Sequence, residues 1–416
     1  MTGPRRGTRQ LALLDRAWLP FRIAWVLGPV DTPDIQEVRA ALTILAERAP
    51  DHPFLSLLDH ENGLYRTVAR SHMPHHVIQM VSELSPDATV SLEKLAASLL
   101  EPQPYPLRIL VGAQHVALAA SHALGDGRSI TRLLAEFLTT RTPTLEKFSG
   151  RTSTWGLLNM AFAQYGGRPR QVFRAVEARR NASSPCVAGG SCAGAPFEDA
   201  LGEMLVWSSR IRDTDLEQLR GWRRENYSAV TMAALVFTMW FRALTRTGAV
   251  PQGFYLLVDA RRYGGTQSER LWGNYAKSVY VRPASVLHPN HVATALRQNL
   301  ASTRPLAALT LQAYDQARQG DAGPRAPGST GEVEYSLTHL AGGALAQLPW
   351  LGDSSETCFV AAATPADPLG VTVTFLEIRG GMIITASLRR DNPEAARVAA
   401  SLQAMTEPLL LLADIF

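Results

Sequence analysis

Two series of strand-like and helix-like segments, one on each side of a segment without periodic apolar residues, constrain the fold of this chain most. The separating segment, NASSPCVAGGSCAGAPF at 181–197, is rich in Gly, Ser, Ala and Pro, a composition typical of linkers. The chain has 416 residues, 46% of them hydrophobic, and is too long for most folds with one core. We therefore expect an N-terminal half over 1–165, a linker or crossover over 166–203, and a C-terminal half over 204–416.

Periodic apolar residues predict the elements of the N-terminal half. Alternating apolar positions indicate a strand over 21–27, and apolar residues at helical spacing indicate a helix over 35–45. The segments 108–111 and 115–120 read as two strands joined by Gly-Ala-Gln. An apolar stripe over 130–138 then predicts an amphipathic helix.

The C-terminal half repeats this mixture of strands and helices, so the predicted fold class is α/β. A hairpin turned by Gly380-Gly381 joins two of its strands, and Pro408 interrupts its last helix. A second flexible stretch is expected at 318–332. We expect strands over 204–209, 254–258, 278–281, 371–378 and 382–388, and helices over 230–244 and 394–411.

Several classes of protein are excluded by composition. The longest apolar runs, such as 233–237, are far too short to cross a membrane, and no apolar signal segment precedes Asp15. The three cysteines, Cys186, Cys192 and Cys358, are too few for a disulfide framework, which favours a reducing cytoplasm. No metal site is expected, because no Cys and His stand together at metal-ligand spacing.

The charge of the chain does not indicate a nucleic-acid partner, and it is compatible with another anionic partner. The net charge is +4, and only three of the 41 basic residues are lysine, a bias typical of a GC-rich bacterial genome. The arginines are scattered and are not interleaved with aromatic residues, so a nucleic-acid surface is not indicated. A mildly basic surface suits a phosphopantetheine carrier or a coenzyme A tail.

The segment SHALGDGRS at 121–129 carries the strongest chemical signal. It places His122 between a predicted strand and a predicted helix, at the edge of a sheet where α/β proteins often bind ligands. A neutral imidazole there can take a proton from an alcohol or an amine. Each residue also has a purely structural alternative: His122 is an ordinary histidine of the sheet edge, Asp126 is a helix cap, and Gly127 permits the turn.

HALGDG resembles the H-x-x-x-D-G signature of the chloramphenicol-acetyltransferase-like superfamily. That group includes peptide-synthetase condensation domains, plant BAHD acyltransferases, wax ester synthases and polyketide-associated acyltransferases. PLRILVGAQHVALAASHALGDGRS is similar to the family's order of Pro-Leu-Arg, two strands, motif and helix. The second half, LLVDARRYGGTQSERLWGNYAKSVYV, resembles the family's D-x-R segment and its later Gly-Asn, at Asp259, Arg261, Gly273 and Asn274.

The resemblance implies two similar α/β domains that meet along a central channel, with His122 at its middle. It implies that His122 is the general base and that the acceptor attacks a coenzyme A or carrier-protein thioester directly, without an acyl-enzyme or a further cofactor. Asp126 would then be structural and paired with Arg261, with Gly127 beside it. Candidates for the substrate channel are Ser121, Asn274 and Lys277.

The expected function is therefore acyl transfer to a small-molecule alcohol or amine in specialised metabolism, by a monomer. Condensation domains usually carry two adjacent histidines, and Ser121 occupies the first of those positions, which weakens the peptide-condensation reading. The plant-type D-F-G-W-G motif is missing as well. The alternative is a non-catalytic module of the same fold that docks carrier proteins.

Overall fold

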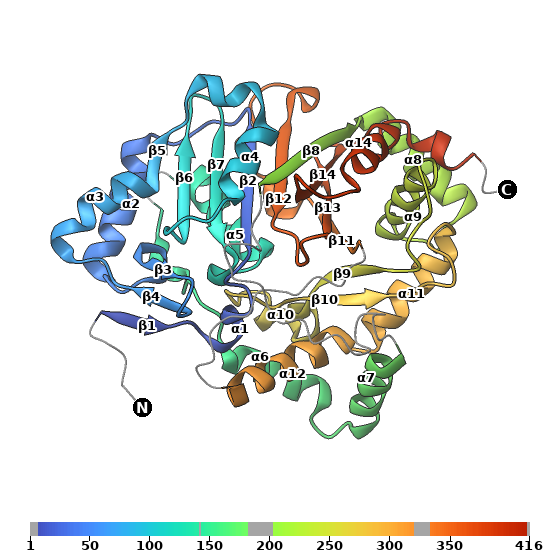
Figure 1. The fold of residues 1–416 in the computed structure, drawn as a ribbon, viewed down its shortest axis with the longest axis horizontal. Coiled ribbons are helices and arrows are strands. Elements are labelled where there is room, and N and C mark those ends of the chain that lie inside the picture. The colour runs from blue at the N-terminus through green and yellow to red at the C-terminus, as the bar shows by residue number, and fades with distance from the viewer. Residues whose placement is uncertain (1–6, 141–142, 182–202, 320–332, 414–416) are drawn as a thin grey trace.

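The computed structural model describes residues 7–140, 143–181, 203–319 and 333–413. Two α/β halves, each built on one large sheet, lie side by side (Figure 1). A small sheet of β1 (Thr8–Gln10), β4 (Leu64–Arg66) and β3 (Leu57–Asp59) lies below the first. The predicted two-part α/β class is thus the observed one.

The sheet of the N-terminal half has five strands, in the order β12-β2-β7-β6-β5. These are β12 (Cys358–Ala363), β2 (Arg22–Gly28), β7 (Val116–Ser121), β6 (Leu107–Val111) and β5 (Val81–Glu83). Side chains of β2 alternate between two hydrophobic clusters, with Trp25 in one and Ala24 in the other. Both faces are therefore buried, because α-helices or the second half of the chain cover each of them.

Four helices pack on this sheet: α2 (Ile35–Arg48), α3 (Met73–Met80), α4 (Leu92–Leu100) and α5 (Gly127–Thr139). The apolar stripes of α2 and α5, predicted from the sequence, join the cluster that contains Trp25. The helix α4 covers the other face, where small residues such as Ala117 and Ala119 allow a close approach.

The sheet of the C-terminal half has six strands, in the order β10-β9-β11-β13-β14-β8. These are β10 (Ala276–Val281), β9 (Phe254–Asp259), β11 (Tyr335–Ala341), β13 (Val371–Ile378), β14 (Gly381–Arg389) and β8 (Met204–Ile211). The helices of this half are α8 (Asp213–Asn226), α9 (Met232–Thr245), α11 (Pro289–Ala301), α12 (Arg304–Gln319) and α14 (Ala395–Ala404). All five strands expected from the sequence are present, and the hairpin turn falls at Arg379-Gly380.

The strand β12 crosses from the second half of the chain to the first sheet. It pairs antiparallel with β2, with Phe359 opposite Leu27. Its other side meets β14, where Ser387 Oγ donates to Ala363 O at 2.6 Å. The two sheets therefore share a boundary, and the division at 165 and 203 predicted from the sequence stays a prediction.

The expected N-terminal half ends with the helix α6 (Thr154–Tyr165), and the helix α7 (Pro169–Asn181) follows it. The linker expected over 166–203 therefore begins with a helix, because Pro169 suits the first turn of a helix and the following residues favour helix formation. The rest of that linker, with Cys186 and Cys192, and nearly all of the stretch 318–332 lie outside the described residues.

Short elements place the site between the halves. They are α1 (Leu13–Arg16), η4 (His122–Leu124), η7 (Ala260–Tyr263) and α10 (Gly265–Ser268), and a further short helix, α13 (Gly343–Ala346), packs against α5. The loop from β9 to β10 contains η7 and α10, and it reaches the first turn of α5. No helix among the described residues is both long and apolar enough to cross a membrane.

Candidate active site

His122 stands at the end of β7, in a turn shaped by its neighbours. The hydroxyl of Ser121 accepts a hydrogen bond from Ala123 N at 3.2 Å, and the backbone N–H of His122 donates to Phe21 O at 2.8 Å. The imidazole stacks on Trp18, with ring centroids 4.0 Å apart and planes 13° apart. Only 6% of His122 is exposed, so backbone and packing hold the ring in one orientation.

The side-chain amide of Asn274 fixes the protonation pattern of this imidazole. His122 Nδ1 lies 2.9 Å from Asn274 Oδ1, and the amide nitrogen of Asn274 donates to Asp15 Oδ1 at 2.8 Å. An amide oxygen can only accept, so Nδ1 of the neutral ring donates its proton to it. This hydrogen-bond network leaves the lone pair of Nε2 able to accept a proton.

Burial lowers the pKa of His122 below its usual 6.5, because a charged imidazolium is poorly solvated in the protein. The charge of Asp126 and the hydrogen bond to Asn274 oppose this shift but do not reverse it. The ring is therefore neutral at pH 7, the form that a general base requires.

Asp126 is both a helix cap and one half of a buried ion pair. Its Oδ1 accepts from Ser129 N at 3.1 Å, which caps α5. Its Oδ2 accepts from Arg261 Nη1 at 2.7 Å and from Tyr275 N at 3.0 Å. The contact with Arg261 implied by the family resemblance is thus present, and it coexists with the cap that was its alternative. The charge of Arg261 and these hydrogen bonds lower the pKa of Asp126, although burial alone would raise it.

All three guanidinium nitrogens of Arg261 donate hydrogen bonds, and two of them, Nη1 and Nη2, reach residues of the N-terminal half. Besides Asp126, it donates to Leu271 O at 3.0 Å, Gly273 O at 2.8 Å and Ser129 Oγ at 3.1 Å. Its side chain is 0% exposed, and its charge stacks over a tyrosine ring at 4.7 Å. A second carboxylate, Asp259, lies 3.0 Å from Nη1. Such a charged group tolerates burial because its donors are satisfied.

Gly273 allows Asn274 to reach His122. Its φ is +126°, and an added Cβ would stand 2.4 Å from Thr152 Oγ1. Only glycine meets both conditions without strain. Its carbonyl also accepts a hydrogen bond from Ser129 Oγ at 3.1 Å, so this backbone turn is anchored to α5.

Three parts of the site had no signal in the sequence: Asp15, Thr152 and Trp18. Asp15 is 0% exposed, and it accepts hydrogen bonds from the backbone N of Thr152 at 2.9 Å and from its hydroxyl. Burial is the main cause that raises the pKa of Asp15 to about 6. These residues lie far from either motif in the sequence. By contrast Trp272 and Tyr275 flank the recognised Gly-Asn, and that position could have identified them.

The channel candidates are placed differently from what was expected. Ser121 and Asn274 are 0% exposed, so they line no open channel in this structure. Ser121 caps a turn, and Asn274 contacts His122 directly because the loop from β9 folds over the motif. Lys277 points elsewhere, since its ammonium group donates to Gln312 of α12 at 2.6 Å.

Gly127 is not required for the turn, which argues against the alternative that gave it this role. It is the first residue of α5 and does not have a positive φ, and an added Cβ would lie 3.8 Å from Trp25 Cζ2, an ordinary contact. Gly125 is the constrained residue of the motif, because a Cβ there would stand 2.8 Å from Ser129 Cβ. The H-x-x-x-D-G signature leaves this position variable, so the pattern alone does not single out Gly125.

In the part of the chain that the structure describes, no three His, Cys, Asp or Glu side chains are grouped so that they could hold a metal ion.

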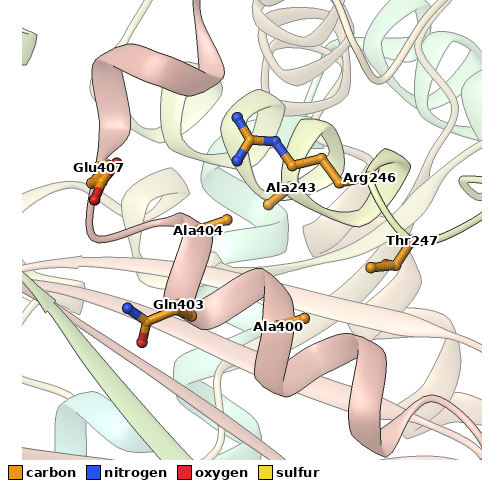
Figure 2. A pocket seen from close by; sticks show the side chains of 7 residues that line it. All are labelled: Ala243, Arg246, Thr247, Ala400, Gln403, Ala404 and Glu407. Atoms are coloured by element: carbon orange, nitrogen blue, oxygen red, sulfur yellow. The ribbon is translucent and has the colours of Figure 1, made fainter.

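A groove of about 310 Å³ lies apart from His122, on the outside of the C-terminal half, between the end of α9 and α14 (Figure 2). Arg246, Gln403 and Glu407 are among the residues that line it, and it shares none with the candidate site.

Comparison with known proteins identifies the fold. No family model matches the sequence, and no curated protein does. Among solved structures, the first condensation domain of the calcium-dependent antibiotic synthetase is 16% identical with a TM-score of 0.60, covering 99% of this chain and 97% of that one. The trichothecene 15-O-acetyltransferase TRI3 of Fusarium sporotrichioides is 11% identical with a TM-score of 0.58, covering 99% and 97%.

The acyl transferase PapA2 is also similar, with 17% identity, a TM-score of 0.51, and coverage of 95% of this chain and 86% of that one. Identities this low establish a common fold and nothing finer. The order of elements, the paired sheets and these matches agree with the resemblance read from the two motifs. The chain therefore has the two-part fold that these condensation domains and acyltransferases share.

Proposed function

We propose that this protein transfers an acyl group from a coenzyme A or carrier-protein thioester to a hydroxyl or amine acceptor in natural-product biosynthesis. The observation that carries the proposal is the hydrogen bond of 2.9 Å from His122 Nδ1 to Asn274 Oδ1. It supports a neutral imidazole whose Nε2 accepts a proton. The structural neighbours, which include an acetyltransferase and condensation domains, favour acyl transfer as the reaction.

The proposed reaction is one direct displacement. Nε2 of His122 takes the proton from the acceptor O–H or N–H, whose electron pair attacks the thioester carbonyl carbon. The tetrahedral oxyanion collapses, the C–S bond breaks, and the leaving thiolate takes the proton from the imidazolium. The net exchange is an ester or amide and a free thiol, with no covalent intermediate on the protein.

Asp126 and Arg261 support this chemistry without touching the reactants. Their contact of 2.7 Å lies among the backbone groups that hold the turn after β7 and the loop before β10. We assign both to the position of His122 relative to Asn274. Gly127, Ser121 and Lys277 receive no chemical role in the proposal.

The test is transfer by the purified protein from a panel of acyl-CoA and acyl-carrier thioesters to alcohols and amines. We expect His122→Ala to lower the rate by about 10²–10⁴-fold, the usual effect of losing a general base. His75→Ala is the control, because that exposed histidine lies away from the site. A His122→Ala protein that folds and keeps activity within a few-fold would refute the role of His122.

Intact mass distinguishes the direct route from a two-step route. Incubation with a thioester alone should leave the mass of the protein unchanged, since no activated nucleophile is proposed. A stable acyl adduct would contradict the direct displacement. If no donor and acceptor pair reacts while carrier proteins still bind, the non-catalytic docking module becomes the better explanation.

A further inference from the structure

A buried carboxylate stands behind the partner of the proposed base. Asp15 Oδ1 lies 2.8 Å from Asn274 Nδ2, and Asn274 Oδ1 lies 2.9 Å from His122 Nδ1. The side chains of Asp15, Asn274 and His122 therefore form a hydrogen-bonded chain from the carboxylate to the imidazole. Asp15 is 0% exposed and comes from α1, far from both motifs in the sequence.

Thr152 completes the arrangement and fixes its direction. Its hydroxyl oxygen accepts from Asn274 N at 2.5 Å, so its own proton points at Asp15 Oδ1. Its backbone N–H donates to Asp15 Oδ2 at 2.9 Å. Both oxygens of Asp15 thus face donors only, as suits an ionised carboxylate.

This carboxylate decides which way the Asn274 amide points. Oxygen and nitrogen of an amide have nearly the same shape, so packing alone does not select one orientation. An ionised carboxylate accepts and cannot donate, so it binds the NH₂ end and turns the oxygen toward His122. The amide oxygen in turn requires the proton on Nδ1.

We infer that Asp15 is a positioning residue for His122, which acts through Asn274 to select the Nδ1–H tautomer and keep Nε2 free to accept a proton. The inference rests on the proposed function only in that Nε2 is taken to be the base. If Asp15 had only a structural role, it would connect α1 to Thr152, and its replacement would leave the tautomer of His122 unchanged. Its ionised form is costly in this position, because within the described residues it forms no ion pair, and Arg261 pairs with Asp126 and Asp259 instead.

The variant Asp15→Asn tests this directly. An NH₂ at the Oδ2 position would face the backbone N–H of Thr152, so the new amide keeps its oxygen there and places its NH₂ at the Oδ1 position. This NH₂ faces the NH₂ of Asn274, and the conflict is relieved when the Asn274 amide flips and presents its NH₂ to His122 Nδ1. We expect His122 to change to the Nε2–H tautomer. The measurement is ¹⁵N NMR of the protein labelled at its ten histidines, at pH 8, with His122→Gln to assign the signal. We also expect kcat to fall by about 10²-fold with a small change in KM.

Two comparisons make the result decisive. Asp59→Asn removes another buried carboxylate, one that binds Asn62 and Arg66, and should leave the tautomer of His122 unchanged. The exchange Asp15→Asn/Asn274→Asp places the carboxylate next to Nδ1 and should restore the Nδ1–H tautomer, even where the single variant folds poorly. A His122 that keeps Nδ1–H in Asp15→Asn, or an exchange variant with Nε2–H, would overturn the inference. The NMR signal needs no substrate, so an inactive wild type would refute the proposed function and leave this test intact.

Discussion

Asp126→Asn keeps the shape of the side chain but replaces one carboxylate oxygen by an NH₂ group, and every hydrogen-bond partner of Asp126 is a donor. Oδ1 faces Ser129 N at 3.1 Å and Arg261 Nη2 at 3.3 Å, and Oδ2 faces Arg261 Nη1 at 2.7 Å and Tyr275 N at 3.0 Å. Both orientations of the new amide therefore set donor against donor. The guanidinium of Arg261, which is 0% exposed, also loses its closest negative charge.

The magnitude follows from the burial of both partners. Breaking a buried pair by neutralising one partner costs about 3–5 kcal/mol, because the remaining charge stays buried, and the partly exposed Asp259 beside Arg261 compensates it only in part. We expect a loss of this size in the free energy of unfolding for Asp126→Asn and for Arg261→Gln. The double variant has no stranded charge, so it should lose about 2–3 kcal/mol less than the sum of the single losses.

The assay is urea denaturation, followed in parallel by tryptophan fluorescence and far-UV circular dichroism. Coincident transitions are required, because two halves that unfold separately would not give one free energy. Arg128→Gln is the matched control: Arg128 is 44% exposed in its pair with Asp259, and its loss should cost less than about 1 kcal/mol. Additivity of the two buried variants within about 0.5 kcal/mol would refute the pairing and leave Asp126 as a helix cap alone.

Two further predictions concern pH and glycine. Burial lowers the pKa of His122 in the folded protein, so kcat/KM should be constant from pH 8 to about 6.5 and fall only below it. The stability that His122 contributes is present above pH 6.5 and is lost at lower pH, as a pH series of urea midpoints would reveal. Gly273→Ala should cost about 2–4 kcal/mol in unfolding free energy and reduce activity, because of the φ of +126° and the clash with Thr152. Gly127→Ala should change stability by less than about 1 kcal/mol, since a Cβ there has room, and equal effects at both glycines would contradict this account.

The sequence was most informative where a local pattern determines a local structure. Apolar periodicity identified β2, β7, α5 and the hairpin of β13 and β14, because each buries a face whose spacing is visible in the chain. It did not reveal Asp15 or Trp18, whose role exists only when α1 packs beside the turn at His122. The sequence also could not show which sheet β12 joins, because the apolar pattern of a strand does not specify which strand it pairs with.

The crossing of β12 has a consequence for synthesis of the chain on the ribosome. The residues of β2, β5, β6 and β7 have all been synthesised once Ser121 is added, but β12 ends at Ala363. Until then the apolar edge of β2 has no neighbour, and unpaired edges invite association between nascent chains. The first sheet thus closes only after most of the second half has been translated. A fragment that stops at residue 203 should therefore aggregate, however complete its own sequence of elements looks.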